Sequence, residues 1–138
     1  MPNPEANYIE KLRNSGLRPT KQRIKICEIL FNREKTFHFS INQLMKIINT
    51  KVNQKISLAT VYNTLHLFCQ HEILKLLRTP SDKFFFDTNI EPHHHFFCKG
   101  SEELFDIGFS EIKISKVPPP PRGKKVSSVQ VIVNLESK

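Results

Sequence analysis

The sequence predicts an α+β protein in which helices fill the first half of the chain and short strands fill the second. Three observations support this prediction. Apolar residues recur at spacings of three and four up to about residue 70, which is typical of helices. After Glu72 the period changes, and two strand-like runs flank the turn residues 80–82. Residues 129–135 then alternate with a period of two, as a strand does.

The first two predicted helices are bounded by residues that commonly begin and end helices. A helix is expected from Pro4 to Gly16, with Gly16 just beyond its last turn. Thr20 is the expected N-cap of a second helix that runs to about Asn32. The expected buried face of this second helix consists of Ile24, Cys27 and Phe31.

The third and fourth predicted helices also carry N-terminal signals. Ser40 and Gln43 have the spacing of a capping box, and Ser57 precedes the next apolar stripe. The polar stretch 49–55 separates the two helices. The residues expected to face inward are Ile41, Leu44, Met45 and Ile48 in the third helix, and Leu58, Val61, Leu65 and Phe68 in the fourth.

A β-hairpin is expected directly after the fourth helix. Residues 73–78 and 83–87 would form its strands around the turn at 80–82. Helices followed by a two-stranded wing are typical of a winged helix-turn-helix, in which one helix enters the major groove of DNA. We therefore expect residues 1–88 to form a winged-helix DNA-binding domain with the fourth helix as its recognition helix.

The charge distribution also favours a nucleic-acid partner. The 138-residue chain has a net charge of +8. Residues 1–88 hold 14 Lys and Arg against 7 Asp and Glu, whereas residues 89–138 hold 7 against 6. Double-stranded DNA is thus preferred to a membrane as the partner of the first half. The alternative is a basic surface that only keeps the protein soluble.

Candidate DNA contacts lie on two helices. Around the start of the second helix, Arg18, Lys21, Arg23 and Lys25 would hold phosphates or reach the minor groove. On the fourth helix, the candidates for base contacts are Thr60, Tyr62 and Asn63, with Ser57 at the helix start. For Tyr62 the alternative is a half-buried aromatic residue without a base contact.

Residues 89–138 are expected to form a small α/β dimerisation domain. A strand at 104–107 follows the turn at 99–101, and the prolines 118–121 form a stiff extended connector before the last strand. A sheet this small buries little surface alone, so pairing with a second copy into a homodimer is expected. A two-fold dimer would present two recognition helices to two half-sites.

Cysteine usage and the absence of targeting signals predict a cytoplasmic protein. Cys27, Cys69 and Cys98 are widely spaced and form no CxxC pair, which favours a reducing compartment. Cys27 and Cys69 lie in helical apolar patterns and are expected to be buried. The N-terminus shows no signal peptide, and no apolar run is long enough to span a membrane.

The histidine triplet 93–95 is the strongest indication of a metal site. Imidazole is the commonest protein ligand of transition metals. On a strand, His93 and His95 would share one face and His94 would point to the other. Phenylalanines on both sides of the triplet oppose the alternative, a solvated tract without a partner.

Three segments resemble the ferric uptake regulator family: residues 16–23, residues 57–65 and the histidine triplet. The match covers almost the whole chain in order. Within the family the chain is most similar to the iron response regulator branch, through residues 86–89, 93–97 and 117–123. The resemblance implies a homodimeric transcription regulator and not an enzyme.

The resemblance also implies a regulatory metal between the two halves. Carried over by position, its ligands are His38, Asp87, His93, His95 and Asp106. Nitrogen and oxygen donors suit Fe²⁺, Mn²⁺ or Zn²⁺, and ligands from both halves would let the ion control their relative angle. Alternatives stay open for some: His38 as a capping or packing residue in a loop, Asp87 and Asp106 as solvated strand ends.

Two features depart from the family pattern. Cys98 is followed three positions later by Ser101, and no cysteine follows, so no structural zinc held by four cysteines is expected. Asn63 stands where the family usually has arginine after the tyrosine of the recognition helix. Asparagine bonds adenine in the way that arginine clamps guanine, which favours an AT-rich inverted repeat as the operator.

The branch resemblance implies haem as a signal that weakens DNA binding, with His93, His94 and His95 as candidate ligands. His93 and His95 share a strand face and therefore cannot supply both axial ligands of one iron. One alternative is a zinc or manganese sensor in which the metal is a co-repressor. A remote alternative is a metal-dependent hydrolase, although no nucleophile or glycine loop accompanies the histidines.

Overall fold

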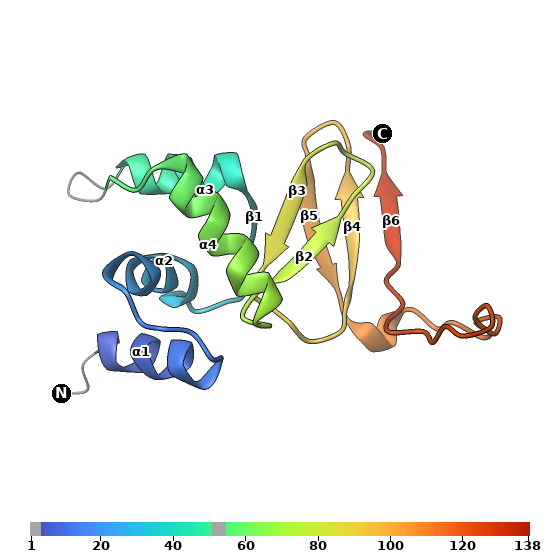
Figure 1. Cartoon of the computed structure of the whole chain (residues 1–138). Helices are drawn as coiled ribbons and strands as arrows, with labels where there is room; N and C mark the ends of the chain where they lie inside the picture. The colour runs from blue at the N-terminus through green and yellow to red at the C-terminus, as the bar shows by residue number, and fades with distance from the viewer. Residues whose placement is uncertain (1–3, 51–54) are drawn as a thin grey trace. The chain divides into compact units, whose positions relative to one another are not determined.

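The computed structural model describes residues 4–50 and 55–138, and it has the predicted α+β architecture (Figure 1). The chain divides into two compact units. The first comprises the chain up to residue 78 together with residues 82–90, and the second comprises residues 79–81 and 91–138. Four helices and a three-stranded sheet make up the first unit, and a second three-stranded sheet lies in the other. None of the described helices has the length and apolar character needed to cross a membrane.

Helices α1 (Pro4–Asn14) and α2 (Lys21–Phe31) pack against each other, and their ends confirm the predicted caps. Gly16 has φ of +83°, a left-handed conformation that residues with a Cβ atom rarely adopt. The Thr20 hydroxyl accepts a hydrogen bond from the Arg23 amide at 3.2 Å, as expected of an N-cap.

The buried face of α2 is wider than the sequence predicted. Ile26, Ile29 and Leu30 are buried together with Cys27, whereas Ile24 and Phe31 are only half-buried at the edge of the core. The reason is that α2 is covered on more than one side, since the same core cluster includes residues of α1, α3 and α4. The spacing of apolar residues predicts one buried face of a helix, so it does not show contacts on the other sides.

Helices α3 (Ile41–Thr50) and α4 (Leu58–Gln70) begin where predicted. Ser40 and Gln43 form the capping box through reciprocal hydrogen bonds of 2.9 and 3.2 Å. Ser57 caps α4 by accepting from the Thr60 amide at 3.2 Å. Residues 51–54 of the predicted polar linker lie outside the described residues. Leu58 was wrongly predicted to be buried: it is 55% exposed, because the first turn of α4 extends beyond the core.

The predicted hairpin consists of β2 (Lys75–Arg78) and β3 (Phe84–Asp87), which pair antiparallel. The expectation of a two-stranded wing was incomplete. A third strand, β1 (His38–Ser40), pairs antiparallel with β3, and the strand order is β1-β3-β2. Three residues are too few to show a strand period, which is why no sequence pattern indicated β1.

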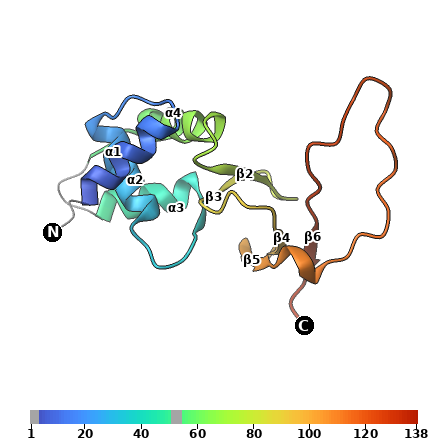
Figure 2. The ribbon, with the colours of Figure 1, turned by 90° about the horizontal axis from the view of Figure 1, so that it is seen from below.

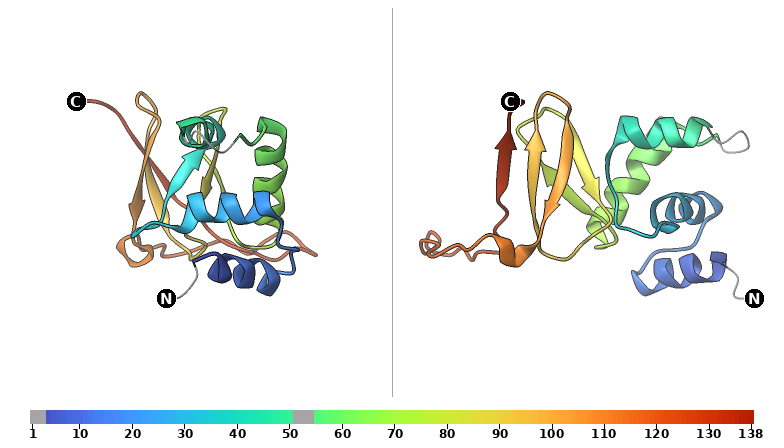
Figure 3. Two further views of the ribbon diagram at one scale, coloured as in Figure 1. Left: turned by 90° about the vertical axis from the view of Figure 1, so that its left-hand side faces the viewer. Right: turned by 180° about the vertical axis from the view of Figure 1, so that it is seen from behind.

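The sheet of the second unit has the order β5-β4-β6, with the histidine strand in the centre (Figure 3). Strand β4 (His94–Cys98) pairs antiparallel with β5 (Glu103–Ile107) and parallel with β6 (Ile132–Leu135). The last strand is shorter than residues 129–135, because its register with β4 begins at Ile132.

A long arm of residues 108–131 connects β5 to β6 and leaves the sheet as an open loop (Figure 2). It begins with one short helical turn, η1 (Phe109–Glu111), and then runs without helix or strand. The prolines 118–121 lead into a reverse turn, in which the Lys124 amide donates to the Pro121 carbonyl at 3.0 Å. Gly123 permits this turn with φ of +81°.

Candidate functional site

The histidine triplet is buried at the start of β4 and its side chains alternate as predicted. The rings of His93 and His95 lie on one side, with centroids 4.4 Å apart. The ring of His94 lies elsewhere, stacked on Phe109 at 5.4 Å. All three side chains are buried, which contradicts the alternative of a solvated tract.

Asp106 joins His93 and His95 from the neighbouring strand. It lies opposite His95 in the β4–β5 ladder. Its Oδ1 atom is 3.3 Å from Nε2 of His95 and 3.6 Å from Nε2 of His93. The candidate ligand atoms of these three residues all lie within 4.8 Å of one another. Two imidazoles and a carboxylate are therefore gathered closely enough to bind one divalent ion.

Hydrogen bonds orient the two imidazoles of this cluster. The Glu91 carbonyl lies 2.7 Å from Nδ1 of His93 and can only accept, so that nitrogen carries the proton. Nε2 of His93, which lies 3.6 Å from Asp106 Oδ1, is then the nitrogen that could bind an ion. The side-chain amide nitrogen of Gln130 lies 3.5 Å from Nδ1 of His95.

His94 fastens the last strand to the sheet. Its Nδ1 accepts a hydrogen bond from the Val131 amide at 2.9 Å, and His95 donates its own amide to the Val131 carbonyl at 3.2 Å. Because the Val131 amide can only donate, Nδ1 of His94 is the acceptor. This nitrogen is thus used within the fold and is not available to a metal or a haem iron.

The two remaining predicted ligands lie in the first unit. His38 and Asp87 face each other across the β1–β3 ladder. Asp87 is fully buried, and its Oδ1 accepts from the Asn89 amide at 2.9 Å. The structure therefore brings the five sequence candidates together as two groups: a cross-strand pair in the first unit and the triad of His93, His95 and Asp106 in the second.

The outer face of α4 carries the predicted base-reading residues. Tyr62 is 44% exposed with its ring 4.3 Å from that of His66, and Asn63 is exposed beside it. Ser57 and Thr60 are joined by a 2.9 Å hydrogen bond at the helix start. Leu58 is also exposed on the first turn of α4. The sequence interpretation missed it because it assigned this residue to the core.

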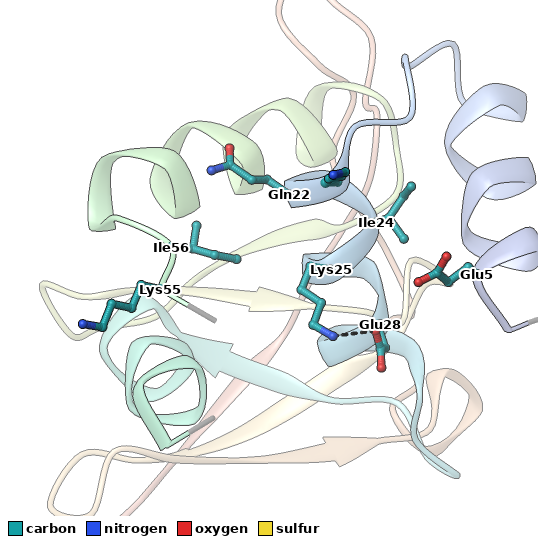
Figure 4. A pocket seen from close by; sticks show the side chains of 8 residues that line it. Glu5, Gln22, Ile24, Lys25, Glu28, Lys55 and Ile56 are labelled. Carbon is teal, nitrogen blue, oxygen red and sulfur yellow. Dashed lines mark hydrogen bonds and ion pairs between the residues drawn. The ribbon is translucent and has the colours of Figure 1, made fainter. Parts of the chain in front are cut away.

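Two of the four predicted phosphate contacts, Lys21 and Lys25, line a hollow of about 670 Å³ in the first unit (Figure 4). Arg23 is held in place, since its guanidinium donates to the Arg18 carbonyl at 2.9 Å. Within the hollow, Lys25 is engaged in an ion pair of 3.1 Å with Glu28. The sequence interpretation missed Lys55, which joins the hollow from a position 24 residues after the end of α2. The lining residues are Glu5, Lys21, Gln22, Ile24, Lys25, Glu28, Lys55 and Ile56.

Comparison with known proteins identifies the family of this chain. The profile of the ferric uptake regulator family matches residues 14–133. The chain is 34% identical over 104 residues to the ferric uptake regulation protein of Bordetella parapertussis, which covers 75% of this chain and 73% of that protein. It is 29% identical over 104 residues to the peroxide-responsive repressor PerR of Staphylococcus epidermidis, covering 75% of this chain and 67% of the repressor.

Solved structures show the same fold. The ferric uptake regulator from Pseudomonas aeruginosa with manganese superposes with a TM-score of 0.73 at 24% identity, covering 95% of this chain and 98% of that one. A zinc-bound manganese uptake regulator superposes with a TM-score of 0.65 at 22% identity, covering 95% and 99% of the two chains.

A winged helix with an exposed recognition helix, followed by a small sheet with a histidine–carboxylate cluster, defines the class of metal-responsive transcription regulators. This chain belongs to the ferric uptake regulator family. Members of the family are DNA-binding regulators and not enzymes, which removes the hydrolase alternative.

Proposed function

We propose that the protein is a homodimeric, cytoplasmic regulator of transcription whose binding to double-stranded DNA is controlled by a divalent ion at the histidine–carboxylate cluster. The observation that carries this proposal is the convergence of His93 and His95 on one oxygen of Asp106, at 3.6 and 3.3 Å. Solved relatives with manganese, zinc and iron support the kind of ion.

The donor set fits such an ion. Imidazole nitrogens with carboxylate oxygens suit Fe²⁺, Mn²⁺ and Zn²⁺, and because Nδ1 of His93 bonds to Glu91, Nε2 is the nitrogen that would bind the ion. We propose that Asp87 and His38 complete the set from the first unit. Asp87 is six positions before His93, so the chain between them spans at most about 20 Å. An ion held by both units would act as a clamp on their relative arrangement.

Metal titration of purified variants tests the site. His93→Ala should weaken binding of Mn²⁺ or Zn²⁺ by at least about tenfold, because a ligand nitrogen is lost. His71→Ala is the matched control, since it removes an imidazole of the first unit that is bonded to the Ser15 carbonyl. If His38→Ala leaves the metal affinity unchanged, the clamp is wrong, whereas unchanged affinity in His93→Ala removes the whole site.

We propose that α4 reads an AT-rich inverted repeat. Asn63 offers the donor and acceptor that adenine requires, and exposed Leu58 offers an apolar contact for the methyl group of thymine. Tyr62, Thr60 and Ser57 would contact the same half-site. Arg18, Lys21, Arg23 and Lys55 would neutralise phosphates beside it.

Binding to DNA of varied sequence tests this face. Asn63→Ala should lose about 1–3 kcal/mol of discrimination at one base pair, while affinity for unrelated DNA stays the same. Lys21→Ala should instead weaken binding to all sequences and reduce its salt dependence by about one phosphate. Asn42→Ala, an exposed asparagine on α3, is the control. A selection that returns GC-rich sites would overturn the proposed operator.

We also propose haem as a ligand that weakens DNA binding, an inference supported by the resemblance to the iron response regulator branch. Of the triplet, His93 and His95 have Nε2 atoms directed at Asp106, whereas His94 uses its Nδ1 within the sheet. One of the first two is then the axial ligand. A Soret band that persists in a variant lacking all three histidines would exclude the triplet, and tighter DNA binding with haem would reverse the sign. A zinc or manganese co-repressor is the alternative; it predicts tighter DNA binding with metal and no haem absorbance.

A further inference from the structure

The arm of the second unit exposes apolar side chains along its whole length. Every residue from 113 to 130 is exposed. Among the described residues 112–130, the one backbone hydrogen bond closes the turn from Pro121 to Lys124. Extended backbone without such bonds is open to pairing with another chain. The large apolar side chains that the arm exposes are Phe109, Ile114, Val117, Val126 and Val129.

One face of the sheet in the same unit is also partly exposed. Phe96 of β4 lies between Phe105 of β5 and Val133 of β6 in the strand register, so these three side chains share a face. Phe105 is 47% exposed, and Phe96 and Val133 are only half-buried. Exposed apolar surfaces of this kind mark interaction sites, because water is a poor solvent for them.

The arm and the sheet have opposite charge. Residues 108–131 hold five Lys and Arg against one Glu, while residues 91–107 hold one Lys against four Asp and Glu. Glu103 lies on the same face as Phe105, two positions away on β5. Basic side chains surround the turn at the tip of the arm, namely Arg122, Lys124 and Lys125.

We propose that the arm of one copy lies over the exposed sheet face of a second copy. The apolar residues of the arm would cover Phe96, Phe105 and Val133, and its basic tip would pair with the acidic edge at Glu103. A second copy is the occupant because the arm leaves its own sheet as an open loop and exposes every side chain from 113 to 130 (Figure 2). A two-fold arrangement lets each arm cover the other sheet, which satisfies both surfaces at once.

The prolines make the arm suitable for this role. Four consecutive prolines hold residues 118–121 extended before any partner arrives. An arm that is already extended loses little conformational entropy on docking. This inference rests on the proposed homodimer and identifies the surfaces that form it.

Complementary charge reversal tests the proposal by sedimentation of the full chain. Reversal of the tip (Arg122→Glu, Lys124→Glu, Lys125→Glu) should weaken self-association by about tenfold or more, because acidic arms then meet acidic sheet edges. Reversal of the sheet edge (Glu102→Lys, Glu103→Lys) should also weaken it. A mixture of the two variants should regain the affinity of the natural chain as a heterodimer. The control has the same change of charge in the first unit: Arg13→Glu, Lys35→Glu and Lys46→Glu.

The other outcomes are distinguishable. If both reversed chains dimerise as tightly as the natural one, the arm does not cover the second copy, although the dimer stands. If the tip variant stays dimeric but loses DNA affinity, the tip contacts DNA and the proposal is overturned. If the natural chain is monomeric at all concentrations, the proposed homodimer itself fails. Val117→Ser with Val126→Ser should weaken the dimer without any change of charge, and an unaltered dimer would contradict the apolar contact.

Discussion

The three cysteines differ in their environment, and so should their chemistry. Burial raises the pKa of the Cys27 and Cys69 thiols to about 11. Cys98 lies at the end of β4, where a hydrogen bond from the Ser101 side chain, followed by backbone amides, lowers its pKa. Of the three thiols, Cys98 therefore has the largest fraction in the thiolate form near neutral pH.

Alkylation followed by mass spectrometry should label Cys98 first. At pH 7.5 the folded protein should be modified first at Cys98, while the half-buried Cys69 reacts more slowly and the buried Cys27 reacts only after unfolding. Replacing Ser101 by alanine should slow the labelling of Cys98, because its thiolate loses a hydrogen bond. Equal labelling of all three would contradict these environments.

The raised pKa of Cys27 also has a consequence for stability. The protonated thiol is favoured in the folded state, so its contribution is complete below the pKa of the unfolded chain, near 9.0, and is lost as the pH rises toward 11. Between these values the free energy of unfolding should decrease, and Cys27→Ala should remove part of this decrease in denaturant titrations followed at each pH. A pH-independent profile between 9 and 11 would contradict the burial of this thiol.

A row of rings connects the strands of the first unit to the exposed face of α4. Phe39 stacks on Phe86 at 5.7 Å, Phe86 meets His66 edge-on at 6.4 Å, and His66 lies 4.3 Å from Tyr62. Within the described residues, Nε2 of His66 is buried without a hydrogen-bond partner. The ring of His66 therefore acts by packing, and it fixes where Tyr62 stands.

Replacing His66 should alter DNA recognition from a distance. His66→Ala removes the support of Tyr62, so affinity for specific DNA should fall by about 1 kcal/mol, while binding to unrelated DNA is preserved. His66→Phe should restore specific binding, because the position needs a ring and not a hydrogen bond. Equal losses for both variants on both kinds of DNA would mean that the helix itself has been disturbed.

Element boundaries were predictable where one residue decides them. Thr20, Ser40 and Ser57 each close a helix start with their own hydroxyl, and that chemistry is visible in the sequence. Strand β1 was not predictable, because its existence depends on β3, almost 50 residues later. The pairing of Asp106 with His95 likewise depends on register, so the sequence could supply it only through the family resemblance.

At the scale of the whole molecule, the ion that the cluster is proposed to bind should stabilise the fold. A ligand present at 100 times its dissociation constant adds about 2.7 kcal/mol, which for a chain of this size corresponds to roughly 5–10 °C in Tm. Scanning calorimetry with and without Mn²⁺ measures this shift. Asp106→Asn should reduce it strongly, while Asp82→Asn, an exposed residue of the hairpin, should leave it intact.

The division of the chain into helical and sheet-based halves followed from periodicity and charge, which are local properties. Periodicity and charge did not predict three features. These are the exposure of Leu58, the position of Lys55 beside α2, and the grouping of the candidate ligands His38 and Asp87 in the first unit. Each depends on where one segment ends relative to another. A single sequence indicates the spatial relation between two distant segments only through its resemblance to a family.

The parallel pairing of β6 with β4 sets an order of events during synthesis. The strand that holds His95 is completed by Val131, whose amide and carbonyl both bond to the histidine segment. A nascent chain that ends before this residue has emerged cannot hold His94 and His95 in place. The proposed cluster can therefore be completed only after Val131 has left the ribosome, and a nascent chain shorter than this should not bind the ion.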